Sequence, residues 1–217
     1  MKISNEARIV SFIGLFFLVI IGFLFWKAPQ ANNVDINTET KDVKVEVDDH
    51  MIGNKDAKVI VVEFGDYECP GCGYVAPFLK QLVDSYKDNP NFSFVFKHYP
   101  LPQHPNALIA AEAAEAAGAQ GKFWEMHEML YAKQSEWSES KEALSIFAGY
   151  AQSLGLDIEK FKQDVSQNKF AEKINLDKKA GDDILLNHTP DVYINGKEAT
   201  NLDPKILKEE IDKALQS

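Results

Sequence analysis

The sequence predicts an α/β domain in which a few buried strands flank a block of helices. Residues 59–62 form an uninterrupted β-branched run, as in a strand that is buried on both faces. Cys69 and Cys72 follow this run after a short loop, and they are the only cysteines in the chain. Helical patterns occupy most of residues 105–185, and a further strand pattern follows at residues 192–194. Strands on both sides of a helical block indicate one α/β domain with a helical insertion.

Residues 1–27 predict a membrane anchor. Residues 9–26 carry no charge, and as a helix they would be about 27 Å long, close to the thickness of the bilayer core. Lys2 and Arg8 lie before this segment, which favours an N-terminus inside the cell and the rest of the chain outside. A cleaved signal peptide is the alternative, and it would leave the domain secreted or periplasmic. Both interpretations place the domain on the extracytoplasmic side.

Residues 28–50 are polar and predict a linker between the anchor and a domain at residues 51–217. Within the linker, Val43, Val45 and Val47 alternate with charged residues. This alternation predicts a short edge strand.

The two cysteines are predicted to open a helix that follows the central strand, residues 58–64. Pro70 suits the first position of a helix, because its φ is preset and its missing N–H leaves no hydrogen bond unmade. Cys69 is then the helix N-cap, and Cys72 lies one turn further, within reach of a disulfide. The partial positive charge of a helix N-terminus favours a thiolate at Cys69. We therefore expect the Cys69 sulfur to be exposed and reactive and the Cys72 sulfur to be covered.

Three other interpretations of the cysteine pair are possible. The pair could be half of a zinc site with His98 and His104, but 25 residues separate Cys72 from His98, more than the roughly 12–15 of a zinc finger. A purely structural disulfide would stabilise little, because so short a loop constrains the unfolded chain weakly. Two free thiols would tend to oxidise outside the cytoplasm. The sequence therefore favours a redox-active pair and no metal site.

Hydrophobic periodicity predicts the remaining elements. The helix that begins at Pro70 and a last helix that begins at Pro204 are each expected to bury one apolar face. The buried positions are Val75, Phe78, Leu79, Leu82, Val83 and Tyr86 in the first helix, and Ile206, Leu207, Ile211 and Leu215 in the last. A second strand is predicted at residues 92–97, and Asn195-Gly196 predicts a hairpin turn. Helical segments are predicted at residues 105–118, 122–134, 140–154, 157–167 and 169–185.

The cysteine segment, Glu-Phe-Gly-Asp-Tyr-Glu-Cys-Pro-Gly-Cys at residues 63–72, resembles the active-site segment of DsbA-like thiol–disulfide oxidoreductases. Three further blocks resemble the same family, and the resemblance covers about residues 45–217. These blocks are Phe-Lys-His-Tyr-Pro-Leu at 96–101, Gly-Lys-Phe-Trp-Glu-Met-His at 121–127 with Leu-Tyr at 130–131, and Thr-Pro at 189–190 with Val-Tyr-Ile-Asn-Gly-Lys at 192–197. The resemblance implies a thioredoxin fold with a helical domain inserted at about residues 103–187.

The resemblance also implies roles for individual residues. Pro190 would follow a cis peptide bond beside the cysteines, and the backbone of Thr189 would pair with an extended substrate. Pro70 and Gly71 complete the active-site motif between the cysteines. Glu63 would be a buried carboxyl that relays the proton of Cys72, although a strand-end residue turned to solvent is the alternative. No cofactor is expected beyond the redox-active disulfide Cys69–Cys72.

These features predict an extracytoplasmic enzyme that introduces disulfide bonds into unfolded or exported thiol-containing proteins. A membrane redox partner would reoxidise the cysteine pair. The net charge of −10 argues against nucleic acid as a partner. Two alternatives remain open from the sequence: a reductase or isomerase that uses the same pair, and a non-enzymatic tethered binding module with a structural disulfide.

Overall fold

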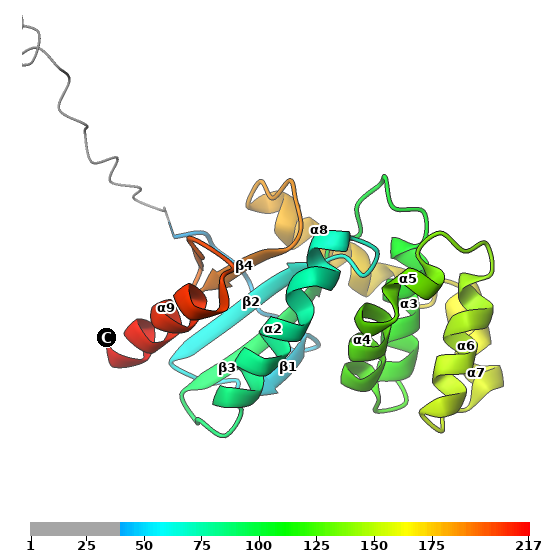
Figure 1. Cartoon of the computed structure of the whole chain (residues 1–217), viewed down its shortest axis with the longest axis horizontal. Helices are drawn as coiled ribbons and strands as arrows, with labels where there is room; N and C mark the ends of the chain where they lie inside the picture. Colours follow the sequence, from blue (N-terminus) through cyan, green and yellow to red (C-terminus); the bar gives the residue numbers. More distant parts are fainter. Residues whose placement is uncertain (1–39) are drawn as a thin grey trace, which may run out of the picture. The chain divides into compact units, whose positions relative to one another are not determined.

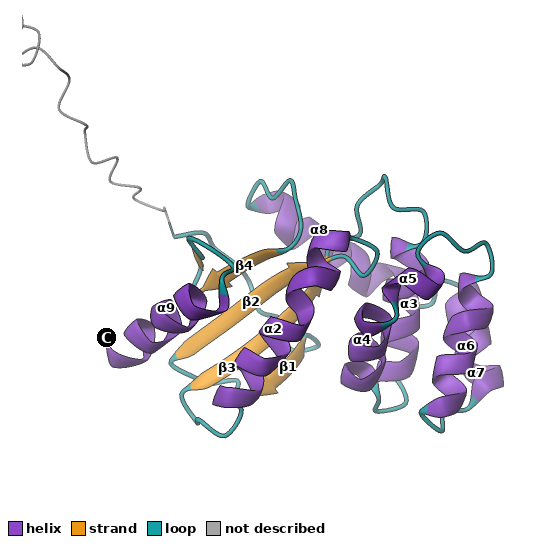
Figure 2. Cartoon of the chain, viewed as in Figure 1, coloured by secondary structure: helices purple, strands orange, loops and turns teal. Residues whose placement is uncertain are grey.

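The computed structural model describes residues 40–217, which form a five-stranded mixed sheet with helices on both faces (Figures 1 and 2). The strands are β1 (His50–Gly53), β2 (Val59–Gly65), β3 (Phe92–His98), β4 (Asp191–Ile194) and β5 (Lys197–Glu198). The helices are α2 (Pro70–Tyr86), α3 (Ala107–Gly118), α4 (Phe123–Ala132), α5 (Gln134–Trp137), α6 (Ala143–Ser153), α7 (Ile158–Ser166), α8 (Ala171–Asp183) and α9 (Pro204–Gln216). This arrangement is the predicted thioredoxin fold with a helical insertion.

The sheet has the order β1-β3-β2-β4-β5, so β2 is its central strand. β2 pairs in parallel with β3 and antiparallel with β4, and β1 and β5 pair antiparallel at the two edges. Successive residues of β2 point to opposite faces. Val59 and Val61 pack in the core that includes α2 and α9, whereas Val62 and Phe64 pack in the second core, which includes residues that follow α8. Burial on both faces explains the continuous apolar run of this strand.

Helices α3 to α7 form the insertion between β3 and α8 (Figure 2). α3 contacts α4, α6 and α7, and its alanines are almost fully buried, so the helix axes can approach closely. The predicted segment 122–134 is interrupted at Lys133, which separates α4 from α5. Asp157 caps α7 by accepting a hydrogen bond from the Lys160 amide.

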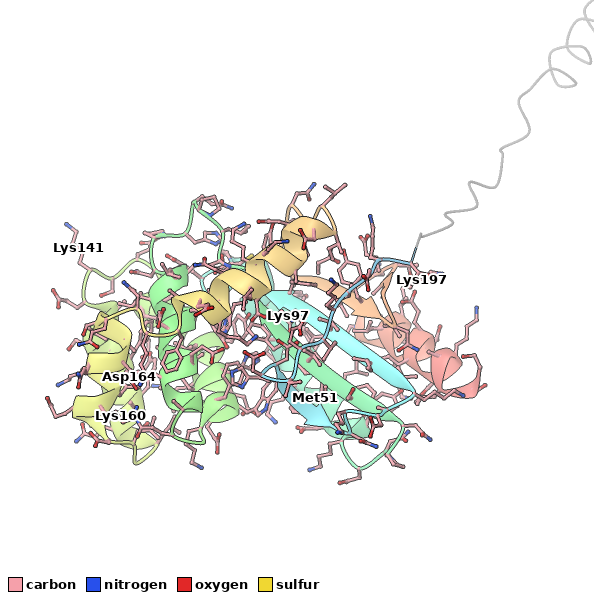
Figure 3. The ribbon with its side chains drawn as sticks, turned by 180° about the vertical axis from the view of Figure 1, so that it is seen from behind. Met51, Lys97, Lys141, Lys160, Asp164 and Lys197 are labelled. Atoms are coloured by element: carbon pink, nitrogen blue, oxygen red, sulfur yellow. The ribbon has the colours of Figure 1, made fainter. Side chains whose placement is uncertain are left out.

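The edge strand predicted at residues 43–47 is wrong, since the edge strand of the structure is β1. Val43 and Val45 do turn toward the second core, which produces the alternation, but the segment forms no strand ladder. At Asp49 the chain is tied to the domain by ion pairs with Lys97 at 2.7 Å and Lys173 at 2.7 Å. Figure 3 shows Lys97 where α8 crosses the sheet. Residues 41–49 of the predicted linker thus contact the folded domain.

Two predicted core residues lie at the surface. Phe78 of α2 is 41% exposed and packs edge-to-face against Tyr74, and Ile206 of α9 is 37% exposed. Both residues lie at the edge of the apolar face of their helix, and the elements that pack against that face do not cover its edge. The hairpin at Asn195-Gly196 is present, with positive φ at both residues, as a type I′ turn requires.

Within residues 40–217, no helix is long and apolar enough to cross a membrane. The predicted anchor, residues 1–27, lies outside the part of the chain that the structure describes.

Candidate active site

Cys69 and Cys72 lie at the N-terminus of α2, at the end of the sheet where β2 finishes. Cys69 is the N-cap, with extended backbone angles (φ −66°, ψ 122°), and Pro70 occupies the first turn, as predicted. Both cysteines are free thiols in this structure. Cys72 is fully buried, and Cys69 is 8% exposed, which is less than the sequence predicts. The difference arises because the Thr189-Pro190 segment packs onto the Cys69 sulfur.

The two thiols have opposite pKa shifts. A hydrogen bond from the Cys72 side chain lowers the pKa of Cys69 to about 5, and contacts with Thr189 and with the backbone amides of Gly71 and Cys72 add to this effect. Burial raises the pKa of Cys72 well above its ordinary value, and the hydrogen bond to Cys69 adds to the shift. One sulfur is thus held as a thiolate at neutral pH while the other keeps its proton.

The reduced protein is therefore expected to absorb at 240 nm as a thiolate with a titration midpoint near pH 5, against the ordinary 9.0 of a cysteine. In a Cys72→Ala variant the largest stabilising contact is gone, so we expect the midpoint to move toward 9. A midpoint above pH 8 in the unaltered protein would contradict the assignment of Cys69 as the thiolate.

The segment Thr189-Pro190 closes over the cysteines. The peptide bond before Pro190 is cis, as the resemblance implies. Sγ of Cys69 lies 3.4 Å from the carbonyl oxygen of Thr189. A β-carbon on Gly71 would lie 3.2 Å from Cδ of Pro190, so the glycine between the cysteines leaves the room that this contact needs. The loop and the motif therefore fit each other through Pro190 and Gly71.

Glu63 lies on β2 with its side chain buried, and only 2% of the residue is exposed. It shares the face of β2 that carries Val59 and Val61, which is the face covered by α2. The solvent-facing alternative is therefore wrong. Burial raises the pKa of Glu63 to about 8, and its charge in turn raises the pKa of Cys72. A carboxyl that holds its proton at neutral pH thus lies near the buried thiol.

Sequence reasoning missed the aromatic hydroxyls beneath the cysteines. The Tyr67 hydroxyl forms a hydrogen bond with Nδ1 of His127 at 3.0 Å, and burial lowers the pKa of His127 to about 3, so its ring is neutral. The Tyr131 hydroxyl lies 2.8 Å from the position that a β-carbon of Gly65 would take. Gly65, at the end of β2, is the sequence feature that could have indicated this packing, because a glycine leaves room for the Tyr131 hydroxyl.

Asp66 joins the active-site loop to the loop after β3. Its backbone amide donates to the Cys72 sulfur at 3.5 Å. Its carboxylate accepts hydrogen bonds from the amides of Glu68 and Leu101 and pairs with His104 at 2.6 Å. The loop that presents the cysteines is therefore fixed on both sides of Asp66.

Gln134 of α5 holds the same loop from the helical insertion. Its side-chain amide donates to the carbonyl oxygens of Tyr67 at 2.7 Å and Cys69 at 2.9 Å. A Gln134→Ala variant is expected to lose about 1–2 kcal/mol of unfolding free energy, because two carbonyls lose their donor. Urea denaturation measures this loss. Gln81→Ala, at an exposed position of α2, is the matched control and should change stability by less than about 0.5 kcal/mol. Equal losses in the two variants would contradict the role given to Gln134.

The histidines of the zinc alternative have other partners. Nε2 of His98 contacts Glu115 at 2.8 Å, and His104 contacts Asp66. Among residues 40–217, no group of three or more His, Cys, Asp and Glu side chains is arranged to hold a metal ion.

The comparisons with known proteins agree with this geometry. A family model described as thioredoxin matches residues 45–213. The chain is 29% identical over the full length of both chains to the "Probable disulfide bond formation protein D" of Bacillus anthracis. It is similar in structure to oxidised BdbD of Bacillus subtilis, with a TM-score of 0.69 and 28% identity over 77% of this chain and 92% of that one. Wolbachia pipientis α-DsbA1 shares the fold, with a TM-score of 0.70 at 19% identity over 79% of this chain and 93% of that one.

Other relatives are much longer proteins. The chain is 40% identical over 160 residues to the Na(+)/H(+) antiporter NhaA 1 of Salinispora arenicola. That match covers 72% of this chain and only 23% of the relative. The similarity therefore concerns one part of the antiporter chain.

The thioredoxin fold, with a thiol pair at a helix N-terminus beside a cis-proline, defines a thiol–disulfide oxidoreductase. The chain belongs to the thioredoxin family. Within it, the chain is similar to BdbD and to a probable disulfide bond formation protein.

Proposed function

We propose that the protein introduces disulfide bonds into exported proteins through Cys69 and Cys72. The observation that carries this proposal is the contrast between the two sulfurs: Cys69 is held as a thiolate at a helix N-cap, and Cys72 is buried and protonated. A stabilised Cys69 thiolate favours the reduced form of the pair, so the disulfide form tends to oxidise other thiols.

In the proposed reaction, a substrate thiolate attacks Sγ of Cys69 in the Cys69–Cys72 disulfide, and Cys72 leaves as a thiolate. A second substrate thiolate then attacks the substrate sulfur of the mixed disulfide, and Cys69 leaves as a thiolate. The substrate gains one disulfide and loses two electrons, which the cysteine pair receives. Glu63 gives its proton to Cys72 when the pair is reduced and takes it back on reoxidation. The high pKa of Glu63 supports this role, because the carboxyl carries a proton at neutral pH.

Thr189 would bind the substrate through its backbone. The residue precedes the cis-proline and its carbonyl faces Cys69, so an extended peptide placed there would lie along the reacting sulfur. Pro190 would hold that segment in place.

The location of the reaction follows from the N-terminal sequence. An apolar segment at residues 9–26 would anchor the chain with the catalytic domain outside the cell membrane, or would be cleaved to release it. An anchored enzyme would lie close to a membrane redox partner, which is the proposed acceptor of the two electrons.

The reduction potential of the pair in the full-length chain tests the direction of the reaction. Equilibration in glutathione buffers should give a value near −120 mV, as for strong oxidants. A value near the −270 mV of thioredoxin would overturn disulfide donation and make the protein a reductase with its own electron source.

A further inference from the structure

The buried sulfur of the pair, Sγ of Cys72, accepts a hydrogen bond from the backbone amide of Asp66 at 3.5 Å. In the proposed reaction this sulfur leaves as a thiolate, although the residue has no exposed surface. Burial, the hydrogen bond with Cys69 and the charge of Glu63 all raise the pKa of Cys72, whereas the Asp66 amide lowers it. The amide therefore favours the charged form of a sulfur whose other surroundings oppose that form.

The turn between β2 and α2 sets the direction of this amide. The carbonyl oxygen of Asp66 accepts a hydrogen bond from the Cys69 amide at 3.1 Å, and its Oδ1 accepts one from the Glu68 amide at 2.8 Å. An aspartate side chain that binds the amide two residues further on forms an Asx-turn. Asp66 thus fixes, with its backbone and its side chain together, the turn that leads to both cysteines.

The second carboxylate oxygen of Asp66 is held from outside this turn. Oδ2 contacts Nδ1 of His104 at 2.6 Å and accepts a hydrogen bond from the Leu101 amide at 2.9 Å. The loop after β3 is itself fixed there, because the His104 amide donates to the carbonyl oxygen of Leu101 at 3.1 Å. Of the hydrogen-bond partners that the carboxylate has in the described part of the chain, only His104 uses its side chain. It is therefore the partner that a substitution can remove.

We propose that His104 is a positioning residue for thiol–disulfide exchange: it holds Asp66 so that the Asp66 amide stabilises the Cys72 thiolate while the disulfide breaks or re-forms. In this step an incoming thiolate attacks Sγ of Cys69 and forms a new sulfur–sulfur bond. The Cys69–Cys72 bond breaks, and Cys72 leaves with the electron pair and is then protonated. The inference rests on the proposed attack at Cys69, but it holds for either direction of the enzyme, because the reverse step begins from the same Cys72 thiolate.

His104→Ala is expected to slow the reduction of the oxidised, full-length chain by glutathione about tenfold, the effect of losing one hydrogen bond to a charged group. The rate of the reverse step should fall by the same factor, so the reduction potential should stay unchanged. The thiolate midpoint of Cys69 should also stay unchanged, since none of the groups that lower its pKa belongs to Asp66 or His104. Acid quenching followed by alkylation of the free thiols measures both rates.

His104→Gln keeps a side-chain N–H donor and should recover most of the lost rate. Gln103→Ala, at the exposed neighbouring position, is the matched control and should react as fast as the unaltered chain. The proposal is overturned if His104→Ala reacts at the unaltered rate, or if His104→Gln is as slow as His104→Ala.

A change in the equilibrium constant with glutathione by the same factor as the rates would also overturn the proposal, because it would show a general distortion of the cysteine motif. The value of the potential in the unaltered chain is a separate result. If it matches that of a reductase, disulfide donation is wrong, and the comparison of rates between the variants still decides the role of His104.

Discussion

Replacing Cys69 with serine is expected to abolish disulfide donation, with a loss on the order of a thousandfold or more, because a hydroxyl cannot form the mixed disulfide. The assay is the oxidation of a reduced, unfolded thiol protein by the full-length chain. Cys69 is the sulfur with the lowered pKa and the only one of the pair with any exposed surface, so Cys72 cannot take its place.

Cys72→Ser is the matched variant for this experiment. It also lacks the disulfide and should donate none, but its Cys69 thiolate can still attack a disulfide-containing peptide and remain attached to it. Cys69→Ser should form no such adduct. An adduct of equal yield in the two variants would show that Cys72 is reached by substrates, against its complete burial.

The catalytic segment was predictable because its information is local. The β-branched strand, the turn and the Cys-Pro-Gly-Cys helix start follow one another within residues 59–72, and each has a direct physical signature. Gln134 was not predictable in this way. It contacts Cys69 across 65 positions of sequence, and nothing in its own neighbourhood indicates that contact.

Periodicity also leaves the extent of burial undetermined. It identifies the apolar face of α2 and α9, but the width of the buried stripe depends on what packs against it, and Phe78 and Ile206 fall outside that width. The alternation at residues 43–47 shows the same limit. A half-buried coil segment and an edge strand both show alternating apolar and charged residues. Only pairing with a neighbouring strand distinguishes the two structures.

Glu63→Gln is expected to stabilise the protein at neutral pH. The pKa of Glu63 is about 8 in the folded chain, against an ordinary 4.5, so the folded state binds its proton more tightly than the unfolded state. The contribution to stability is complete below pH 4.5 and is lost as pH rises through 8. At pH 7 the loss is about 3 kcal/mol, and glutamine, which does not ionise, avoids it.

Urea denaturation at pH 4, 7 and 8.5 measures this effect. The variant and the unaltered chain should have the same stability at pH 4, and the variant should become the more stable with rising pH. Glu128→Gln, at a half-exposed position of α4, is the control and should stay within about 0.5 kcal/mol at each pH. A stability difference that does not change with pH would contradict a raised pKa at Glu63.

The same substitution should slow the reaction, because glutamine cannot give a proton to Cys72 or take one back. We expect a loss on the order of a hundredfold in the rate of thiol exchange at pH 7. The pair of results separates two reasons for a buried carboxyl in an otherwise apolar core. If glutamine raises stability and lowers the rate, the carboxyl is retained at Glu63 for proton transfer, in spite of its effect on folding. If glutamine raises stability and leaves the rate unchanged, the proton of Cys72 moves by another route, and the assignment of Glu63 as the relay is wrong.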